Sequence, residues 1–156
     1  MNNNHIFRRL RYIFDLNESK IIDLYAHTNH KTSKNQLAQW LKKDDDENYT
    51  EINDKNLAIF LNGLIVEFRG KRDGPPMQPE NKLNNNIILR KLKIALNMQV
   101  EEMIKIFKLA DMNVSQHELT AFFRNPKQKQ YRECQNQFLR NFITGLQIKY
   151  DGQKSL

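Results

Sequence analysis

Apolar residues recur along the chain at intervals of three and four, the spacing that places them on one face of an α-helix. Four such stretches occupy the first half of the sequence. They run over about residues 4–15, then after Asn17, after Ser33, and from Leu57 to Phe68. No segment alternates apolar and polar residues with the period of two that a half-buried strand requires. The pattern predicts an all-α protein.

The second half of the sequence repeats the first without a gap. Residues 2–70 align in register with residues 84–152, from the three asparagines that open each copy to the glycine that ends it. Self-similarity over so long a period indicates two supersecondary units that share a core or dock face to face. We therefore predict a single domain over residues 1–156, in which two tandem four-helix repeats pack about a pseudo-twofold axis. Residues 71–83, rich in Pro and Gly, are predicted to be the linker.

Polar residues mark the starts of the predicted helices. The asparagine run before each first helix supplies an N-cap, and a serine followed three residues later by Gln or Glu opens each third helix. Gly63 and Gly145 lie inside the fourth helices, where glycine costs roughly 1 kcal/mol relative to alanine. We expect the two fourth helices to cross at these glycines, near the axis; the alternative is a glycine tolerated at the surface.

The bulk composition excludes several classes of protein. Hydrophobic residues make up 39% of the 156 residues, enough to bury a core, and Cys134 is the sole cysteine, so the chain forms no internal disulfide. The start has no apolar stretch of signal-peptide length, and no run approaches the roughly 18 apolar residues of a membrane span. These features predict a reduced, cytoplasmic location.

An enzyme is not expected, and no metal or cofactor is predicted. His27 and His30 lack the further ligands of a metal site, and Cys134 aligns with Ile52 of the first repeat, which indicates a small core residue. Tyr and Glu recur as identical pairs in both repeats, Tyr49 with Glu51 and Tyr131 with Glu133. They mark either a site or, as we favour, a tie between a loop and the fourth helix.

The net charge of +7 is unevenly distributed. Residues 1–82 hold 13 Lys and Arg against 12 Asp and Glu, whereas residues 83–156 hold 12 against 6. Each first helix also carries a basic triad opposite its apolar stripe. The triads are Arg8, Arg9 and Arg11 in the first repeat and Arg90, Lys91 and Lys93 in the second. As symmetry mates they would grip two stretches of phosphate; the alternative is a solvated helix face.

The join between the second and third helices of the second repeat resembles a helix-turn-helix. Asn113 is expected to adopt the left-handed conformation in the turn, and Val114 and Leu119 to be buried behind it. In that hypothesis Gln116, His117, Thr120 and Arg124 face a groove, and Lys127, Lys129 and Arg132 contact phosphates. The alternative is an ordinary pair of helices joined by a capped turn.

The loop before the fourth helix reverses its charge between the repeats. It reads Asp44-Asp45-Asp46-Glu47 in the first repeat and Pro126-Lys127-Gln128-Lys129 in the second. The acidic run lacks the alternating ligand spacing and the turn glycine of a calcium loop. It is therefore expected to be a surface patch for a basic partner rather than a metal site.

Three stretches together resemble a known family. They are FLNGLIVEFRGK at residues 60–71, NNNIILRKLKIAL at 84–96 and YRECQNQFLRNFITGL at 131–146. The chain resembles, over nearly its whole length, the YehS family of small bacterial proteins made of a duplicated domain of unknown function. The resemblance implies no catalytic or binding residues.

The sequence thus predicts a non-enzymatic helical protein with two alternative functions. The leading hypothesis is binding of DNA or RNA through the basic helix faces, with contacts from both triads and from Arg124, Lys127, Lys129 and Arg132. The alternative is a protein-interaction adaptor or homodimeric regulator that uses the acidic loop and an apolar groove between the repeats.

Overall fold

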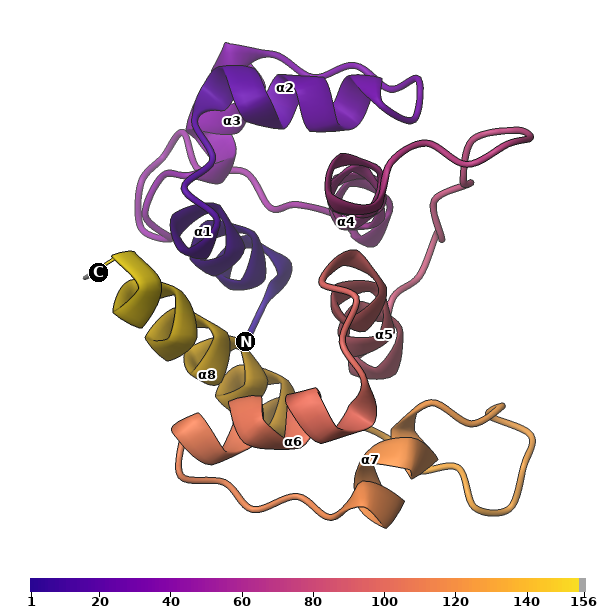
Figure 1. The fold of residues 1–156 in the computed structure, drawn as a ribbon. Coiled ribbons are helices and arrows are strands. Elements are labelled where there is room, and N and C mark those ends of the chain that lie inside the picture. Colours follow the sequence, from indigo (N-terminus) through magenta and orange to yellow (C-terminus); the bar gives the residue numbers. More distant parts are fainter. Residues whose placement is uncertain (155–156) are drawn as a thin grey trace. The chain divides into compact units, whose positions relative to one another are not determined.

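The computed structural model describes residues 1–154, which form eight α-helices and no strand (Figure 1). The helices of repeat 1 are α1 (Asn3–Ile13), α2 (Glu18–Ala26), α3 (Lys34–Trp40) and α4 (Asp54–Arg69). Those of repeat 2 are α5 (Asn85–Ala95), α6 (Val100–Leu109), α7 (Gln116–Phe122) and α8 (Asn136–Lys154). The predicted all-α fold of two tandem four-helix repeats is confirmed.

The chain divides into two compact units, with the boundary between Leu83 and Asn84. The linker therefore belongs with repeat 1, and the Leu83 N–H donates a hydrogen bond to the Asp54 carboxylate at 2.8 Å. Each unit has its own buried apolar side chains. That the repeats form one domain about a pseudo-twofold axis stays a prediction.

Aromatic rings occupy the centre of each unit. In repeat 1 the ring of Phe7 contacts Trp40 edge-on at 5.9 Å between centroids and Phe60 at 4.8 Å, which joins α1, α3 and α4. In repeat 2 the rings of Phe107 and Phe142 lie 5.3 Å apart and join α6 to α8. These residues belong to the apolar stripes that the sequence pattern predicts.

The three asparagines that open each repeat have different roles. Asn2 caps α1, since its side-chain oxygen accepts from the His5 N–H at 2.9 Å, and Asn84 caps α5 through the Ile87 N–H at 2.8 Å. The next asparagine, Asn3, donates to the Ile52 carbonyl at 3.0 Å and to the carboxylate of Asp54 at 2.8 Å. The predicted N-caps are confirmed, but only for the first asparagine of each run.

Asn4, the third asparagine, is buried and fully hydrogen-bonded. Its Nδ2 donates to the carbonyls of Trp40 at 3.1 Å and Thr50 at 2.9 Å, and its Oδ1 accepts from the Ile52 N–H at 2.9 Å. One side chain thereby ties α1 to the end of α3 and to the segment that leads into α4. Asn86 makes the same three bonds in repeat 2, to the Phe122 carbonyl (3.0 Å), the Arg132 carbonyl (2.8 Å) and the Cys134 N–H (2.9 Å).

Within residues 1–154, four residues other than glycine have a positive φ, and they form two repeat pairs. Asp15 (54°) and Asn97 (52°) follow the first helix of each repeat, and Asn29 (64°) and Asp111 (57°) follow the second. At Asp111 this conformation lets the next N–H, that of Met112, return to the Phe107 carbonyl at 3.1 Å. The expectation that Asn113 takes the left-handed conformation is wrong, because α6 ends at Leu109 and the left-handed residue of the turn is Asp111.

The two helix glycines face the second helix of their own repeat. A Cβ built on Gly63 would lie 2.8 Å from the carbonyl carbon of Leu24 in α2, and one on Gly145 would lie 2.8 Å from that of Ile106 in α6. Such distances are shorter than a Cβ tolerates, so the glycines permit a close backbone approach. The predicted close approach of two helix backbones at each glycine is therefore present, but the expectation that the partner is the other fourth helix is wrong.

Cys134 is a buried core residue, as its alignment with Ile52 predicts. Both side chains are 4% exposed, and the Cys134 N–H is held by Asn86. Burial raises the pKa of the Cys134 thiol to about 12. A thiol in that state is a poor nucleophile at neutral pH, because the thiolate is the reactive form.

Replacement of Asn4 by Ala is expected to lower the free energy of unfolding by about 2–4 kcal/mol, because it leaves buried backbone groups unpaired. Urea denaturation followed by circular dichroism measures the change. Asn35→Ala is the matched control, since Asn35 is exposed on α3 and the change should stay within about 0.5 kcal/mol. A loss below about 1 kcal/mol for Asn4→Ala would contradict the role assigned to the amide.

Gly63→Ala and Gly145→Ala are each expected to destabilise the protein by about 1–3 kcal/mol, because overpacking against the second helix outweighs the gain in helix propensity. Gly152→Ala provides the control, since a Cβ there meets nothing within 4 Å. Its melting temperature should be unchanged or higher. Equal melting temperatures for all three variants would refute the close approach.

The Cys134 thiol is expected to react with a disulfide reagent at pH 8 far more slowly than a free thiol, because a pKa near 12 leaves roughly a thousandfold less thiolate than usual. The rate of modification, followed by absorbance, should rise in denaturant to that of a free thiol. Since Cys134 is the sole cysteine, the signal has one source. Rapid modification of the native protein would show that the side chain is accessible.

Candidate nucleic-acid interface

The first arginine of each basic triad closes the end of the third helix. Arg8 Nη2 donates to the Lys42 carbonyl at 3.1 Å, beyond the end of α3, and Arg90 Nη2 donates to the Phe123 carbonyl at 3.4 Å, beyond the end of α7. A cation at the C-terminal end of a helix is favourable, because the last carbonyls lack partners within the helix. Arg8 is half-buried, whereas Arg90 is exposed.

The other triad positions are unequally accessible. At the second position Arg9 is half-buried and Lys91 is buried, with 9% of its surface exposed. At the third position Arg11 and Lys93 are both half-buried. Lys91 is therefore a poor phosphate ligand, and the six basic residues do not form the uniform solvent-facing triads that the sequence suggests.

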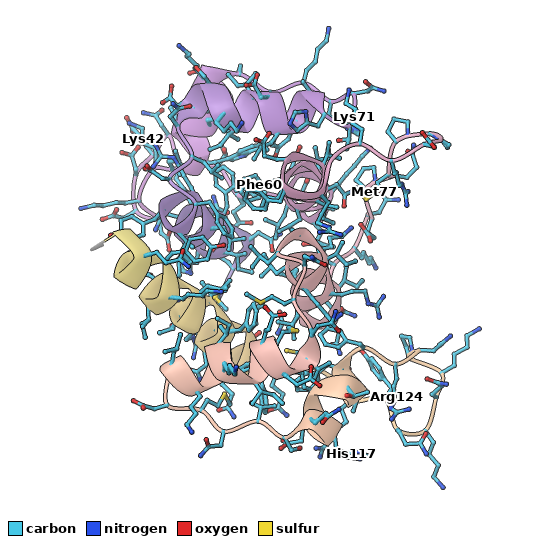
Figure 2. The ribbon with its side chains drawn as sticks, in the orientation of Figure 1. Lys42, Phe60, Lys71, Met77, His117 and Arg124 are labelled. Atoms are coloured by element: carbon cyan, nitrogen blue, oxygen red, sulfur yellow. The ribbon has the colours of Figure 1, made fainter. Side chains whose placement is uncertain are left out.

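Phe123, directly after α7, contacts two basic residues of α5 in repeat 2. Its carbonyl accepts from Arg90, and Lys93 Nζ lies 5.9 Å from the centroid of its ring, within the range of a cation–π contact. Arg124 follows directly, where α7 gives way to the loop before α8 (Figure 2). The sequence places Phe123 on an apolar face and gives no signal for this bridging role.

The loop between α7 and α8 holds its own shape and extends away from the helices of repeat 2 (Figure 1). Asn125 Oδ1 accepts from the Lys127 N–H at 2.9 Å, and Gln128 Oε1 accepts from the Asn125 N–H at 3.1 Å. Lys127, Lys129 and Arg132 are exposed. The end of the loop is fixed because Asn86 binds the Arg132 carbonyl.

We call the following residues the basic surface of repeat 2. They are Arg90, Lys93, Arg124, Lys127, Lys129 and Arg132.

The corresponding loop of repeat 1 has a similar shape and the opposite charge. Asp46 Oδ1 accepts from the Asn48 N–H at 2.8 Å, and the Asp44 carboxylate pairs with His5 Nε2 at 3.4 Å. Partial burial, with the charges of Asp44 and Glu51, raises the pKa of the Tyr49 hydroxyl. The two repeats therefore present one loop geometry with opposite electrostatic potentials.

Tyr131 and Glu133, the second Tyr/Glu pair, line a groove of about 540 Å³ in repeat 2. Its other lining residues are Glu118, Phe122, Arg132, Gln135, Gln137 and Phe138. Burial raises the pKa of the Tyr131 hydroxyl, the charge of Glu133 raises it further, and Arg90 acts in the opposite direction. The tyrosine therefore lies within electrostatic reach of the basic surface. A tie between this loop and the fourth helix stays a prediction.

The α6–α7 pair differs from a groove-reading helix-turn-helix. Residues 110–115 separate the two helices, whereas such motifs usually have a turn of about three or four residues. α7 has seven residues, about two turns, and Arg124 lies beyond its end. Gln116 and His117 are exposed, but Thr120 is half-buried. The geometry favours the plain capped turn over the recognition motif.

The histidines of repeat 1 contact ordinary polar partners. His27 Nε2 lies 2.9 Å from Glu67 Oε1, and Lys20 Nζ lies 2.6 Å from Glu67 Oε2. Hydrogen bonds from Lys20 and His27 lower the pKa of the Glu67 carboxyl. His30 Nδ1 lies 3.3 Å from the Thr28 hydroxyl. Among residues 1–154 no three His, Cys, Asp or Glu side chains gather as a metal site.

An exposed apolar patch that included Trp40 or Phe123 would favour a protein partner. Trp40 is 4% exposed, and Phe123 is half-buried. No helix in the described part of the chain is long and apolar enough to span a bilayer. The protein-partner hypothesis therefore depends on other surfaces than the one around Trp40.

Comparisons with known proteins give the same organisation as the internal repeat. A family model described as "Protein of unknown function (DUF1456)" matches twice, at residues 3–70 and 85–152. The chain is 39% identical over 155 residues to "Uncharacterized protein YehS" of Escherichia coli (strain K12), and the match covers 99% of each chain. No solved structure matches. The chain belongs to this family of unknown function, DUF1456, with two copies of its domain in tandem.

Proposed function

We propose that the chain is a non-enzymatic nucleic-acid-binding protein and that repeat 2 carries the binding surface. The observation that supports this proposal is the reversed charge of one loop on two similar scaffolds. In repeat 1 the loop before the fourth helix carries Asp44, Asp45, Asp46 and Glu47. In repeat 2 it carries Lys127 and Lys129 and is flanked by Arg124 and Arg132.

The basic surface of repeat 2 has the properties that phosphate binding requires. Lys127, Lys129 and Arg132 are exposed, on a loop whose backbone is held by its own hydrogen bonds. Arg90 and Lys93 extend the positive potential onto α5. Such a surface binds phosphates by releasing condensed counterions, so its affinity depends steeply on salt.

A protein partner or a second copy of the chain is the competing hypothesis. Tyr12 and Ile94 occupy the same position of the first helix in the two repeats, and they are 57% and 45% exposed. Exposed apolar side chains at equivalent positions would suit self-association. Light scattering at several protein concentrations distinguishes this hypothesis from nucleic-acid binding. The average mass of a protein that dimerises falls on dilution, whereas the mass of a monomer stays constant.

The variant Lys127→Gln/Lys129→Gln/Arg132→Gln is expected to weaken binding to labelled nucleic acid. The slope of log affinity against log salt concentration should become shallower by about 2–3, because each phosphate contact contributes about 0.9. Fluorescence anisotropy at several salt concentrations measures both the affinity and this slope. Lys91 is left unchanged because its burial would confound binding with stability.

The matched control removes the same charge from repeat 1. Lys31, Lys34 and Lys55 are exposed, and Lys31→Gln/Lys34→Gln/Lys55→Gln should leave most of the affinity intact. Equal losses for the two triple variants would mean that binding follows net charge alone. Absence of binding by the unaltered protein at low salt would refute the proposal.

A further inference from the structure

We infer that the groove lined by Tyr131 and Glu133 receives an unpaired nucleobase, so that the ligand of repeat 2 is single-stranded nucleic acid. The inference rests on the proposed function and deepens it. It also assigns a role to the Tyr/Glu pair of repeat 2, in which Tyr131 is half-buried and Glu133 is exposed. Three features of the groove carry the argument: its aromatic walls, its polar rim and its place beside the phosphate-binding residues.

Aromatic side chains from three segments form the walls of the groove. Phe122 at the end of α7 is buried, and its ring contacts that of Phe138 in α8 edge-on, with centroids 5.2 Å apart. Phe138 and Tyr131 are half-buried, so each ring keeps part of its surface toward solvent. A half-exposed aromatic ring beside a hollow is a stacking platform that every base can use.

Polar groups at the rim match the edges of a base. Glu133, Gln135 and Gln137 are exposed and line the groove, and they supply carboxylate and amide oxygens and amide donors. The carboxylate of Glu118, also in the lining, accepts from the Ser115 N–H at 3.3 Å and is thereby held in place. Groups of this kind recognise the Watson–Crick edge, which is free only in an unpaired base.

Arg132 joins the groove to the basic surface. It lines the groove, is exposed, and follows the loop that carries Lys127 and Lys129. A nucleotide whose base enters the groove would therefore have its phosphate on the cationic side. A duplex fits this arrangement poorly, since its bases are stacked and paired and must be extruded at a cost of a few kcal/mol.

Repeat 1 provides an internal comparison. A groove of about 370 Å³ lies at the corresponding place, where Gln36, Trp40 and Asn56 replace Glu118, Phe122 and Phe138. Tyr49 does not belong to its lining, and the neighbouring loop is acidic. The inference therefore assigns base binding to repeat 2 alone.

The test compares three probes with the full chain: a labelled 12-nucleotide single-stranded DNA of mixed sequence, its duplex, and inorganic polyphosphate as a competitor without bases. We expect the single strand to bind at least about fivefold more tightly than the duplex, and polyphosphate to displace the duplex more readily than the single strand. Tyr131→Ala should lower single-strand affinity about fivefold or more while leaving duplex affinity unchanged, because stacking contributes only to the former.

Two variants separate stacking from a folding defect. Tyr131→Phe keeps the ring and should retain single-strand affinity, and Tyr49→Ala removes the equivalent tyrosine of repeat 1 and should have no effect. If Tyr131→Ala unfolds, as shown by circular dichroism, Gln135→Ala/Gln137→Ala replaces it. That double variant should change the relative affinities for oligo-dA, oligo-dC and oligo-dT, because it removes base-edge contacts.

The outcomes distinguish the failure of this inference from that of the proposed function. Equal affinity for single strand, duplex and polyphosphate would overturn the inference and leave the phosphate-binding surface standing. Tighter binding of the single strand that is unaffected by both Tyr131→Ala and the glutamine pair would overturn the groove as its site. No binding of any probe would overturn both, and would turn the search to protein ligands.

Discussion

Each repeat depends on one buried asparagine. Asn4 and Asn86 bind backbone groups from the end of the third helix and from the segment that leads into the fourth, and thereby fix three parts of the repeat relative to one another. A buried amide that satisfies all its partners specifies one geometry, because any shift leaves a donor or acceptor unpaired in a low-dielectric interior. The aromatic core supplies the hydrophobic driving force, but it does not by itself define where the loop begins and ends.

This constraint explains how the two loops can differ so much in charge. The ends of each loop are held by the side chain of the buried asparagine, and its interior by hydrogen bonds from loop N–H groups to the side chains of Asp46 and Asn125. The charge reversal falls at other positions, where Asp45 and Glu47 align with Lys127 and Lys129. Substitutions from carboxylate to ammonium therefore change the electrostatic potential and leave the scaffold intact. The duplication gives the chain one surface of each sign on similar frameworks.

Much of the fold can be predicted from the sequence. The parts that cannot be predicted escape for physical reasons. Helical periodicity and capping residues predict the eight helices, because both signals are local. The helix that packs against Gly63 is not predictable from a local signal. A glycine inside a helix indicates that another backbone approaches closely, but it does not indicate which one. The sequence also does not distinguish Asp111 from Asn113 as the left-handed residue of the turn, because both residue types tolerate a positive φ. The same limit of local signals applies at the candidate site. The burial of Lys91 and the contact of the Phe123 carbonyl both depend on residues that are distant in the sequence.

The hydrogen-bond network of the buried asparagine contains a different intrinsic probe of unfolding in each repeat. Trp40, the sole tryptophan, has its carbonyl bound by Asn4, and Cys134, the sole cysteine, has its N–H bound by Asn86. Indole fluorescence therefore follows the opening of repeat 1, and thiol exposure follows that of repeat 2. The free energy of coupling between the halves of this duplicated protein is thus accessible without adding a label to either half.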